Sequence, residues 1–173
     1  MTRAHSALLA TTLGVIAASA GCAPADQGES YLEMSDVGAY TEYVHPLLEG
    51  TCATLDCHGS RGRPLRLYST TGLRIRDDLR TPAGVPEIPA TDEELAANVR
   101  SIDAVDQDEV DVDARFVLSK PISDTGGGIH HHGGQIWYGR DDVAYRCVRA
   151  WLTGSIDVDA CAEAKVRDAL PPP

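Results

Sequence analysis

"CATLDCHG", residues 52 to 59, places two cysteines and a histidine within seven residues. The motif that ties a haem to a chain is Cys-x-x-Cys-His, whereas here four residues, 53 to 56, separate the cysteines. Cys57 and His58 are adjacent, as are the second attached cysteine and the iron-binding histidine in that motif. The stretch leaves three interpretations open: a haem site with a longer loop, a metal-ion site, or a small Cys52–Cys57 disulfide ring.

The first 21 residues have the pattern of an export signal. Arg3 precedes a small and apolar run, residues 7 to 20, which is shorter than the roughly 20 apolar residues that span a bilayer. The residues before Cys22 form a lipoprotein-type cleavage box, and ordinary signal-peptidase cleavage after Ala20 is the alternative. We favour lipidation because the alternative leaves Cys22 as an odd thiol. No Asp follows Cys22 to mark inner-membrane retention, so the expected location is the outer membrane, facing the periplasm.

The chain that follows the signal has room for one domain with a real core. Residues 22–34 are small and polar and predict a lipidated tether, so the domain is expected at 35–170. The whole chain has a formal net charge of −11, which argues against nucleic acid as a partner. Membrane contact is expected through the lipid anchor only.

Helical spacing of apolar residues predicts a mostly α-helical domain with long loops rich in Gly and Pro. A first helix is expected from Ser35 or Asp36 to Cys52, with a kink at His45-Pro46. The predicted helices after it begin at the capping box Thr91–Glu94, span Arg140–Leu152 with Gly154 as its stop, and span Asp157–Leu170. The acidic stretch 103–113 lacks the Gly and Glu of a calcium-binding loop and is predicted to be a solvated loop.

Cys147 and Cys161 lie 14 residues apart on two consecutive predicted helices. A short turn around Gly154 joins these helices, so an antiparallel arrangement can bring the two thiols together. In an oxidising compartment a disulfide is expected, and closing a loop of this length stabilises a fold by about 3 kcal/mol.

Two alternatives to a haem site remain at this level. Cys52, Cys57, His58 and one of the histidines 130 to 132 form a chemically acceptable Cys2His2 zinc set. The other alternative is a non-catalytic lipoprotein with two disulfides, Cys52–Cys57 and Cys147–Cys161, and no cofactor. The chain has no Gly-x-Ser-x-Gly elbow and no prominent acid pair, so no catalytic residue is assigned.

The order of several short motifs resembles the small cytochrome c-like domains of exported bacterial proteins. In that family a helix ending Val-x-Pro-x-Leu leads into the haem motif, and a Leu-x-Leu stretch, Lys-Pro, a His-Gly-Gly turn and a helix ending Trp-x-x-Gly follow. The matching stretches here are "VHPLLEGTCATLDCHG", "GRPLRLYS", "SKPISDTGGGIHHHGG" and "YRCVRAWLTG". The resemblance covers about residues 37 to 154, and the four-residue gap between the cysteines departs from the family's pattern.

The resemblance implies a haem c that is attached to Cys52 and Cys57, with His58 as its proximal ligand. No methionine follows the motif, so the family's His-Gly-Gly pattern places the distal ligand at His132, with His131 and His130 as alternates. Ligation by two histidines favours a low reduction potential relative to a Met/His pair. The implied function is one-electron transfer to an unidentified redox partner protein, without catalysis.

On this interpretation the haem lies between the helix that ends at Cys52 and the helix 140–152. The apolar residues expected to form its walls are Leu47, Leu48, Leu65, Leu67, Ile136, Trp137, Val148 and Trp151.

Overall fold

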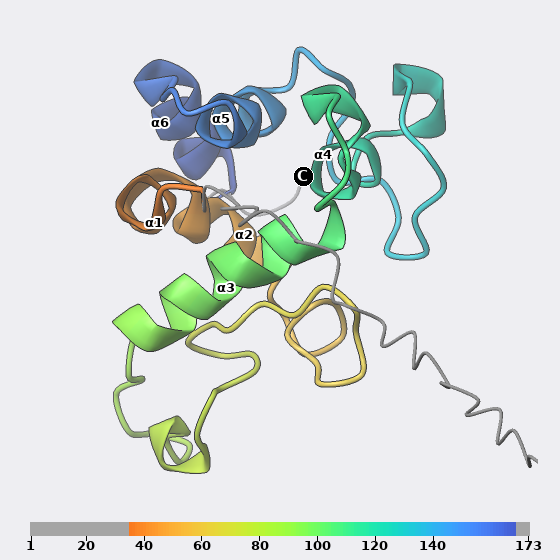
Figure 1. The fold of residues 1–173 in the computed structure, drawn as a ribbon. Helices are drawn as coiled ribbons and strands as arrows, with labels where there is room; N and C mark the ends of the chain where they lie inside the picture. The colour runs from red at the N-terminus through yellow and green to blue at the C-terminus, as the bar shows by residue number, and fades with distance from the viewer. Residues whose placement is uncertain (1–34, 169–173) are drawn as a thin grey trace, which may run out of the picture. The chain divides into compact units, whose positions relative to one another are not determined.

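The computed structural model describes residues 35–168, which form helices joined by long loops (Figure 1). Within this range no strand occurs, and β-structure is limited to two isolated bridges, Tyr68–Leu73 and Ile122–Trp137. The prediction of a mostly α-helical domain is confirmed. The predicted signal 1–21, the tether 22–34 with its lipidation site Cys22, and the last residues of the final predicted helix lie outside the described residues.

The first helical region runs from Val37 to Thr51 in three parts, α1 (Val37–Ala39), a π-helical turn (Tyr40–Val44) and α2 (His45–Thr51). Asp36 caps its start, because its side chain accepts a hydrogen bond from the Ala39 N–H at 3.0 Å. Pro46 lacks an N–H and its ring crowds the preceding turn, so the widened π turn lies directly before it, where the sequence predicts a kink.

Helix α3 (Asp92–Val105) begins at the predicted capping box, in which Thr91 and Glu94 exchange hydrogen bonds. Its predicted apolar face, Leu95, Val99 and Ile102, is buried. The acidic stretch 103–113 is not a solvated loop throughout, because its first residues complete α3 and Asp113 binds Arg149, with 2.6 Å between Oδ1 and Nε.

Short helical turns follow α3, at Val112–Ala114, α4 (Phe116–Ser119) and Asp124–Gly126. The Gly- and His-rich residues 127–135 after them contain no regular element, as predicted. In the loop between α2 and α3, the one helical element is the short turn Asp77–Leu79, and the bridge Tyr68–Leu73 precedes it.

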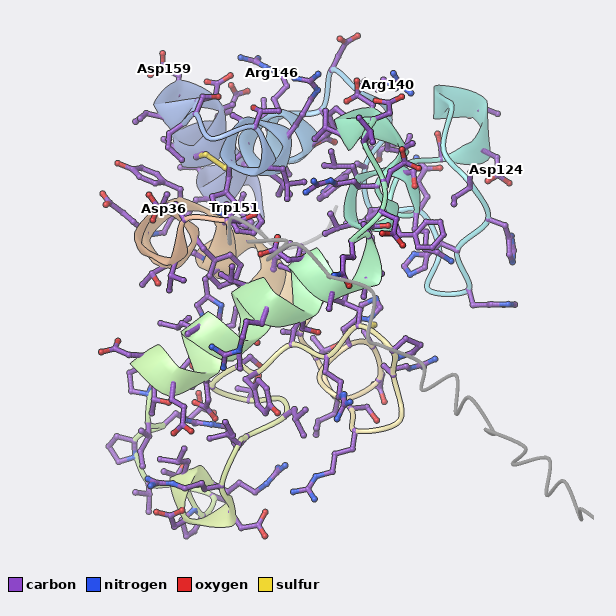
Figure 2. All side chains as sticks on the ribbon, viewed as in Figure 1. Asp36, Asp124, Arg140, Arg146, Trp151 and Asp159 are labelled. Atoms are coloured by element: carbon purple, nitrogen blue, oxygen red, sulfur yellow. A yellow bond between two sulfur atoms is a disulfide. The ribbon has the colours of Figure 1, made fainter. Side chains whose placement is uncertain are left out.

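Helices α5 (Val143–Leu152) and α6 (Val158–Asp168) are joined by the predicted Cys147–Cys161 disulfide, the yellow bond in Figure 2. α5 starts three residues later than predicted, because Asp142 acts as its N-cap and accepts a hydrogen bond from the Ala144 N–H at 2.9 Å. Gly154 follows the helix with a φ of 72°, which matches its predicted role as the stop.

Trp151 of α5 joins the C-terminal helix pair to the first helical region. Its indole donates a hydrogen bond to the Asp36 carbonyl at 2.8 Å, and its ring packs on Tyr40 with 5.3 Å between centroids. Both rings are almost fully buried, and burying a side chain of this size stabilises a fold by roughly 1.5–3 kcal/mol. This contact keeps the helix that leads to Cys52 in a fixed position.

Candidate functional site

The motif 52–59 folds back on itself at the end of α2. Cys52 is the C-cap of α2, and its N–H donates to the Leu48 carbonyl at 2.9 Å. The Cys52 carbonyl then accepts a hydrogen bond from the His58 N–H at 2.9 Å. Among the four residues between the cysteines, Ala53 is 1% exposed and Leu55 is 55% exposed. The longer gap therefore inserts one residue into the core and loops others out to solvent.

Two glycines allow this compact arrangement. A Cβ on Gly59 or on Gly72 would lie 2.1 Å from the Ala53 carbonyl oxygen, which is far inside contact distance. The Ser69 hydroxyl donates to the same oxygen at 2.9 Å. Gly59 is thus required by close packing within the motif, and Gly72 by the packing of residues 69–72 against the motif.

A cavity of about 1070 Å³ opens beside the motif. Cys52, Cys57 and His58 lie in its wall. The other lining residues come from α2, 63–68, α3, α4 and 131–137, together with Asp56, Lys120 and Pro121. The cavity is large, since ligand pockets typically span roughly 300–1000 Å³. The predicted haem position lies between the helix that ends at Cys52 and the helix 140–152. The cavity is elsewhere, because none of its lining residues belongs to α5.

Five of the eight predicted wall residues line the cavity: Leu48, Leu65, Leu67, Ile136 and Trp137. The prediction is wrong for Leu47, Val148 and Trp151, which are buried in the core because α5 packs on the first helical region and on α6. The predicted walls did not include the apolar residues that α3 and α4 supply, which are Ala97, Ile102, Ala104, Val105, Phe116 and Val117. The helical spacing of Ala97, Ser101 and Ala104, a small-residue face beside the buried one, was the signal available.

The rings of His58 and His131 face each other at the cavity. Their planes are parallel within 4° and their centroids are 6.0 Å apart. His58 donates from Nδ1 to the Leu65 carbonyl at 3.0 Å, and His131 donates from Nδ1 to the Gly134 carbonyl at 3.1 Å. A carbonyl oxygen can only accept, so Nδ1 carries a proton in both rings and, in a neutral imidazole, Nε2 holds the lone pair. Metal-binding histidines are typically held by this kind of hydrogen bond.

The environment of His58 favours its neutral form. Burial lowers the pKa of His58, the hydrogen bond with the Leu65 carbonyl opposes this shift, and His131, Arg63 and Lys120 lower the pKa further. Only a neutral imidazole has a lone pair to offer, so the depressed pKa favours the ligating form.

The three consecutive histidines are placed differently. His131 is half-buried and faces His58, whereas His130 and His132 are exposed and pack edge to face on each other, 4.9 Å between centroids. His132 also reaches the cavity wall. The pairing with His58 thus involves the alternate, His131, and not the preferred candidate His132.

Four basic side chains line the same cavity: Arg63, Arg66, Arg100 and Lys120. None of the four belongs to an ion pair within residues 35–168, although Arg63 donates to the Asp56 carbonyl at 3.2 Å. In a chain of net charge −11, this group gives the cavity wall a local positive charge.

The structure does not support the alternatives to a haem site. Cys57 has a free thiol, so the small Cys52–Cys57 ring is not formed. In the described part of the chain, no three His, Cys, Asp or Glu side chains gather as a metal-ion site, which gives the Cys2His2 zinc interpretation no support.

Comparison with known proteins gives no relative: no protein-family model, no curated protein and no solved structure matches the chain. Within residues 35–168 there is also no helix with the length and apolar character needed to cross a membrane.

Proposed function

We propose that the chain binds haem c and acts as a one-electron carrier. The observation that carries the proposal is the His58–His131 pair, two parallel imidazoles with their Nε2 atoms available at the wall of a large cavity that two cysteines also line. When bound, the haem supplies an iron centre that alternates between the ferric and ferrous states.

The His58 and His131 rings are stacked with 6.0 Å between their centroids, so both side chains are near enough to hold one metal. A metal bonds an imidazole nitrogen in the plane of the ring, about 2 Å away, so the two rings would turn from this stacked arrangement when the haem binds. A haem needs only these two protein ligands, since its porphyrin supplies the other four donors.

The remaining lining suits the other parts of a haem. Cys52 and Cys57 would form the two thioether bonds, and the apolar residues from 65–67, α3, α4 and 136–137 would contact the porphyrin. The four basic side chains would meet the two propionate groups, because guanidinium and ammonium groups bind carboxylates through charge-assisted hydrogen bonds. The apolar and basic lining of the cavity therefore supports the proposal.

The proposed ligand set is His58 with His131, in place of His132. Two histidine ligands favour a lower reduction potential than a Met/His pair. The role is electron transfer and not catalysis, with a redox partner protein that receives or supplies the electron. Export, lipidation at Cys22 and an outer-membrane position facing the periplasm belong to the same proposal, because covalent haem attachment and the Cys147–Cys161 disulfide both suit an exported protein.

The decisive experiment is to express the full chain with a cytochrome c maturation system and to record a pyridine haemochrome spectrum after denaturation, together with zinc content and free thiols. Haem that stays on the denatured chain supports the proposal. A chain without haem that holds one zinc, or that has no free thiol, contradicts it.

A further inference from the structure

The two facing histidines are held very differently, and His58 is the fixed one. Its N–H donates to the Cys52 carbonyl at 2.9 Å, and its own carbonyl accepts from the Leu67 N–H at 2.9 Å. Its ring donates to the Leu65 carbonyl. Gly59, the next residue, donates from its N–H to the Thr54 carbonyl at 2.9 Å. The hydrogen bonds of His58 therefore tie it both to Cys52 at the end of α2 and to residues 65–67.

His131 lies in the segment 130–135, which is anchored only at its ends. The Ile129 N–H donates to the Ser119 carbonyl at 3.1 Å, and the Ile136 N–H donates to the Pro121 carbonyl at 2.9 Å. Between these anchors, the only backbone hydrogen bond that the structure gives to 130–135 joins the Gly134 N–H to the His131 carbonyl at 2.9 Å. The ring of His131 also bonds to Gly134. Both bonds lie inside the segment and survive if it moves as a unit.

The composition and exposure of the segment favour such movement. Apart from His131, all its residues are exposed. Gly134 has a φ of 82°, and Gly127, just before the first anchor, has a φ of 87°. A segment with few buried contacts and few hydrogen bonds to the rest of the fold opens at a low free energy. Of the two facing histidines, His131 is therefore the one that moves away more easily.

We propose that His131 is a releasable ligand and that an uncharged diatomic molecule, such as carbon monoxide or nitric oxide, can take its place. This inference rests on the haem site proposed above. The step is a ligand substitution without electron transfer, in which His131 leaves as a neutral imidazole and the entering molecule donates a lone pair instead. Phe116, Val117 and Ile136 supply part of the apolar lining of the same cavity, against which an uncharged molecule can be placed. The protein would then bind a small gas in addition to carrying electrons.

The test uses carbon monoxide and the reduced, haem-loaded full chain. Wild-type protein is expected to bind carbon monoxide at a rate that levels off with concentration, because release of His131 becomes limiting. In the His131→Ala variant no imidazole would have to leave before carbon monoxide binds. If the released state of the wild type is populated at about 0.1–10%, this variant gains about 10- to 1000-fold in apparent affinity. His130→Ala, which changes an exposed histidine of the same segment that does not line the cavity, is the matched control and should behave as wild type.

A second measurement needs no haem. In hydrogen exchange on the haem-free full chain, the amides of 130–135 are expected to exchange about tenfold or more faster than those of 57–67. Equal protection of the two segments overturns the inference. So does a haem-loaded wild type that is inert to carbon monoxide while His131→Ala binds it, although the proposed function then stands. A His130→Ala variant that binds carbon monoxide as His131→Ala does also overturns the inference. A chain that retains no haem removes the proposed function itself.

Discussion

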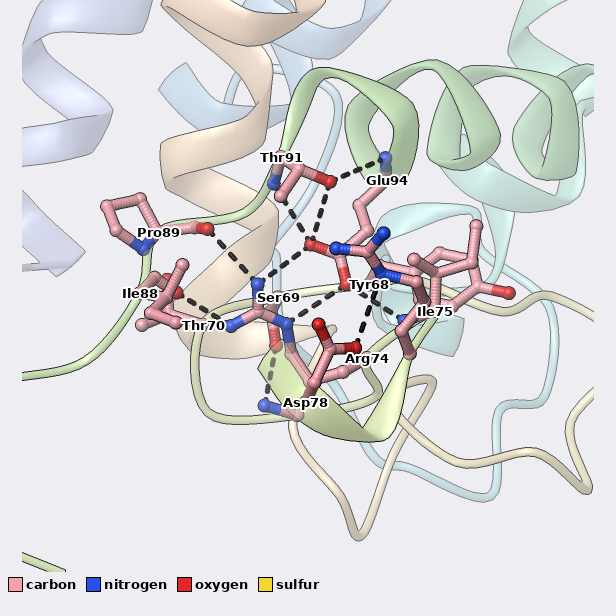
Figure 3. Close-up of polar contacts among 12 residues, drawn as sticks. Tyr68, Ser69, Thr70, Arg74, Ile75, Asp78, Ile88, Pro89, Thr91 and Glu94 are labelled. Atoms are coloured by element: carbon pink, nitrogen blue, oxygen red, sulfur yellow. Dashed lines mark hydrogen bonds and ion pairs between the residues drawn. The ribbon is translucent and has the colours of Figure 1, made fainter. Parts of the chain in front are cut away.

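Arg74 and Glu94 form a two-point ion pair in which both side chains are almost completely buried (Figure 3). The Arg74 Nε lies 3.0 Å from Oε1 of Glu94, and Nη2 lies 2.9 Å from Oε2. Arg74 also donates to the Ile88 and Pro89 carbonyls, while Glu94 accepts from the Ile75 and Thr91 N–H groups. The pair thereby fastens both ends of the loop 74–91 to the first turn of α3, one of the helices that line the cavity.

Breaking this pair is expected to destabilise the fold strongly. Burial by itself raises the pKa of Glu94, but the hydrogen bonds from Arg74, Thr91 and Ile75 outweigh it and bring that pKa below its usual value, so the carboxylate is charged at neutral pH. Arg74→Met leaves this charge buried without its partner, and the free energy of unfolding should fall by about 3–5 kcal/mol in urea denaturation.

Arg76→Met is the matched control for that variant. Arg76 pairs with Asp78 at 3.3 Å, but both side chains are more than half exposed, so the same substitution should change the free energy of unfolding by less than about 1 kcal/mol. Equal effects of the two substitutions would show that the buried pair does not fasten the loop.

Asp113 should make the fold sensitive to acid. Hydrogen bonds from Arg149 and Tyr145 hold the pKa of Asp113 below its usual value, against the effect of partial burial. A carboxylate with a depressed pKa stabilises the fold fully above its unfolded pKa, about 3.9, and this contribution is lost as the pH falls through the folded pKa. Asp113→Asn should therefore be less stable at pH 7, by about 1–3 kcal/mol, and should lose less stability than wild type below pH 4.

Urea midpoints at pH 7 and pH 3 measure this difference. Asp108→Asn, which changes an exposed aspartate of the same acidic stretch, serves as the control and should follow the wild-type profile. An Asp113→Asn profile that runs parallel to wild type at both pH values would rule out the linkage.

The Cys147–Cys161 disulfide is expected to support the fold without supporting the cofactor. Replacing both cysteines with Ala removes a cross-link between residues 14 apart, and the free energy of unfolding should fall by about 3 kcal/mol. The haem content should stay at the wild-type level, because no residue of α5 lines the cavity. Loss of haem at unchanged stability would instead favour a haem position against α5.

Local signals explain which elements the sequence predicts well. The capping box Thr91–Glu94 and the apolar stripe of 143–152 depend only on neighbours in the chain, and both helices form where expected to within a few residues. The Cys147–Cys161 pairing follows from a short turn between two such helices.

Features that depend on long-range packing cannot be predicted from the sequence. Nothing local indicates that Arg74 reaches Glu94, 20 residues away, or that α3 and α4 supply walls of the cavity in place of α5. The choice between His131 and His132 depends on a single turn, in which Gly134 holds the His131 ring. Adjacent histidines in a glycine-rich loop have the same sequence signal.

The cysteine motif allows the most direct test of the unusual spacing. Cys52 and Cys57 both lie in the cavity wall although four residues separate them. Ala53 is buried in the core, and the chain then turns back so that the His58 N–H donates to the Cys52 carbonyl.

If each thiol forms one thioether, Cys52→Ala and Cys57→Ala should each retain haem through the other sulfur. The vinyl group left unsaturated extends the conjugation of the porphyrin, so the haemochrome band of both variants should move to longer wavelength than in wild type. The double variant should release its haem to acidified organic solvent, whereas a chain without Cys147 and Cys161 should keep it attached. Extraction of haem from only one of the two single variants would mean that the longer loop allows one bond, at the cysteine whose removal releases the haem.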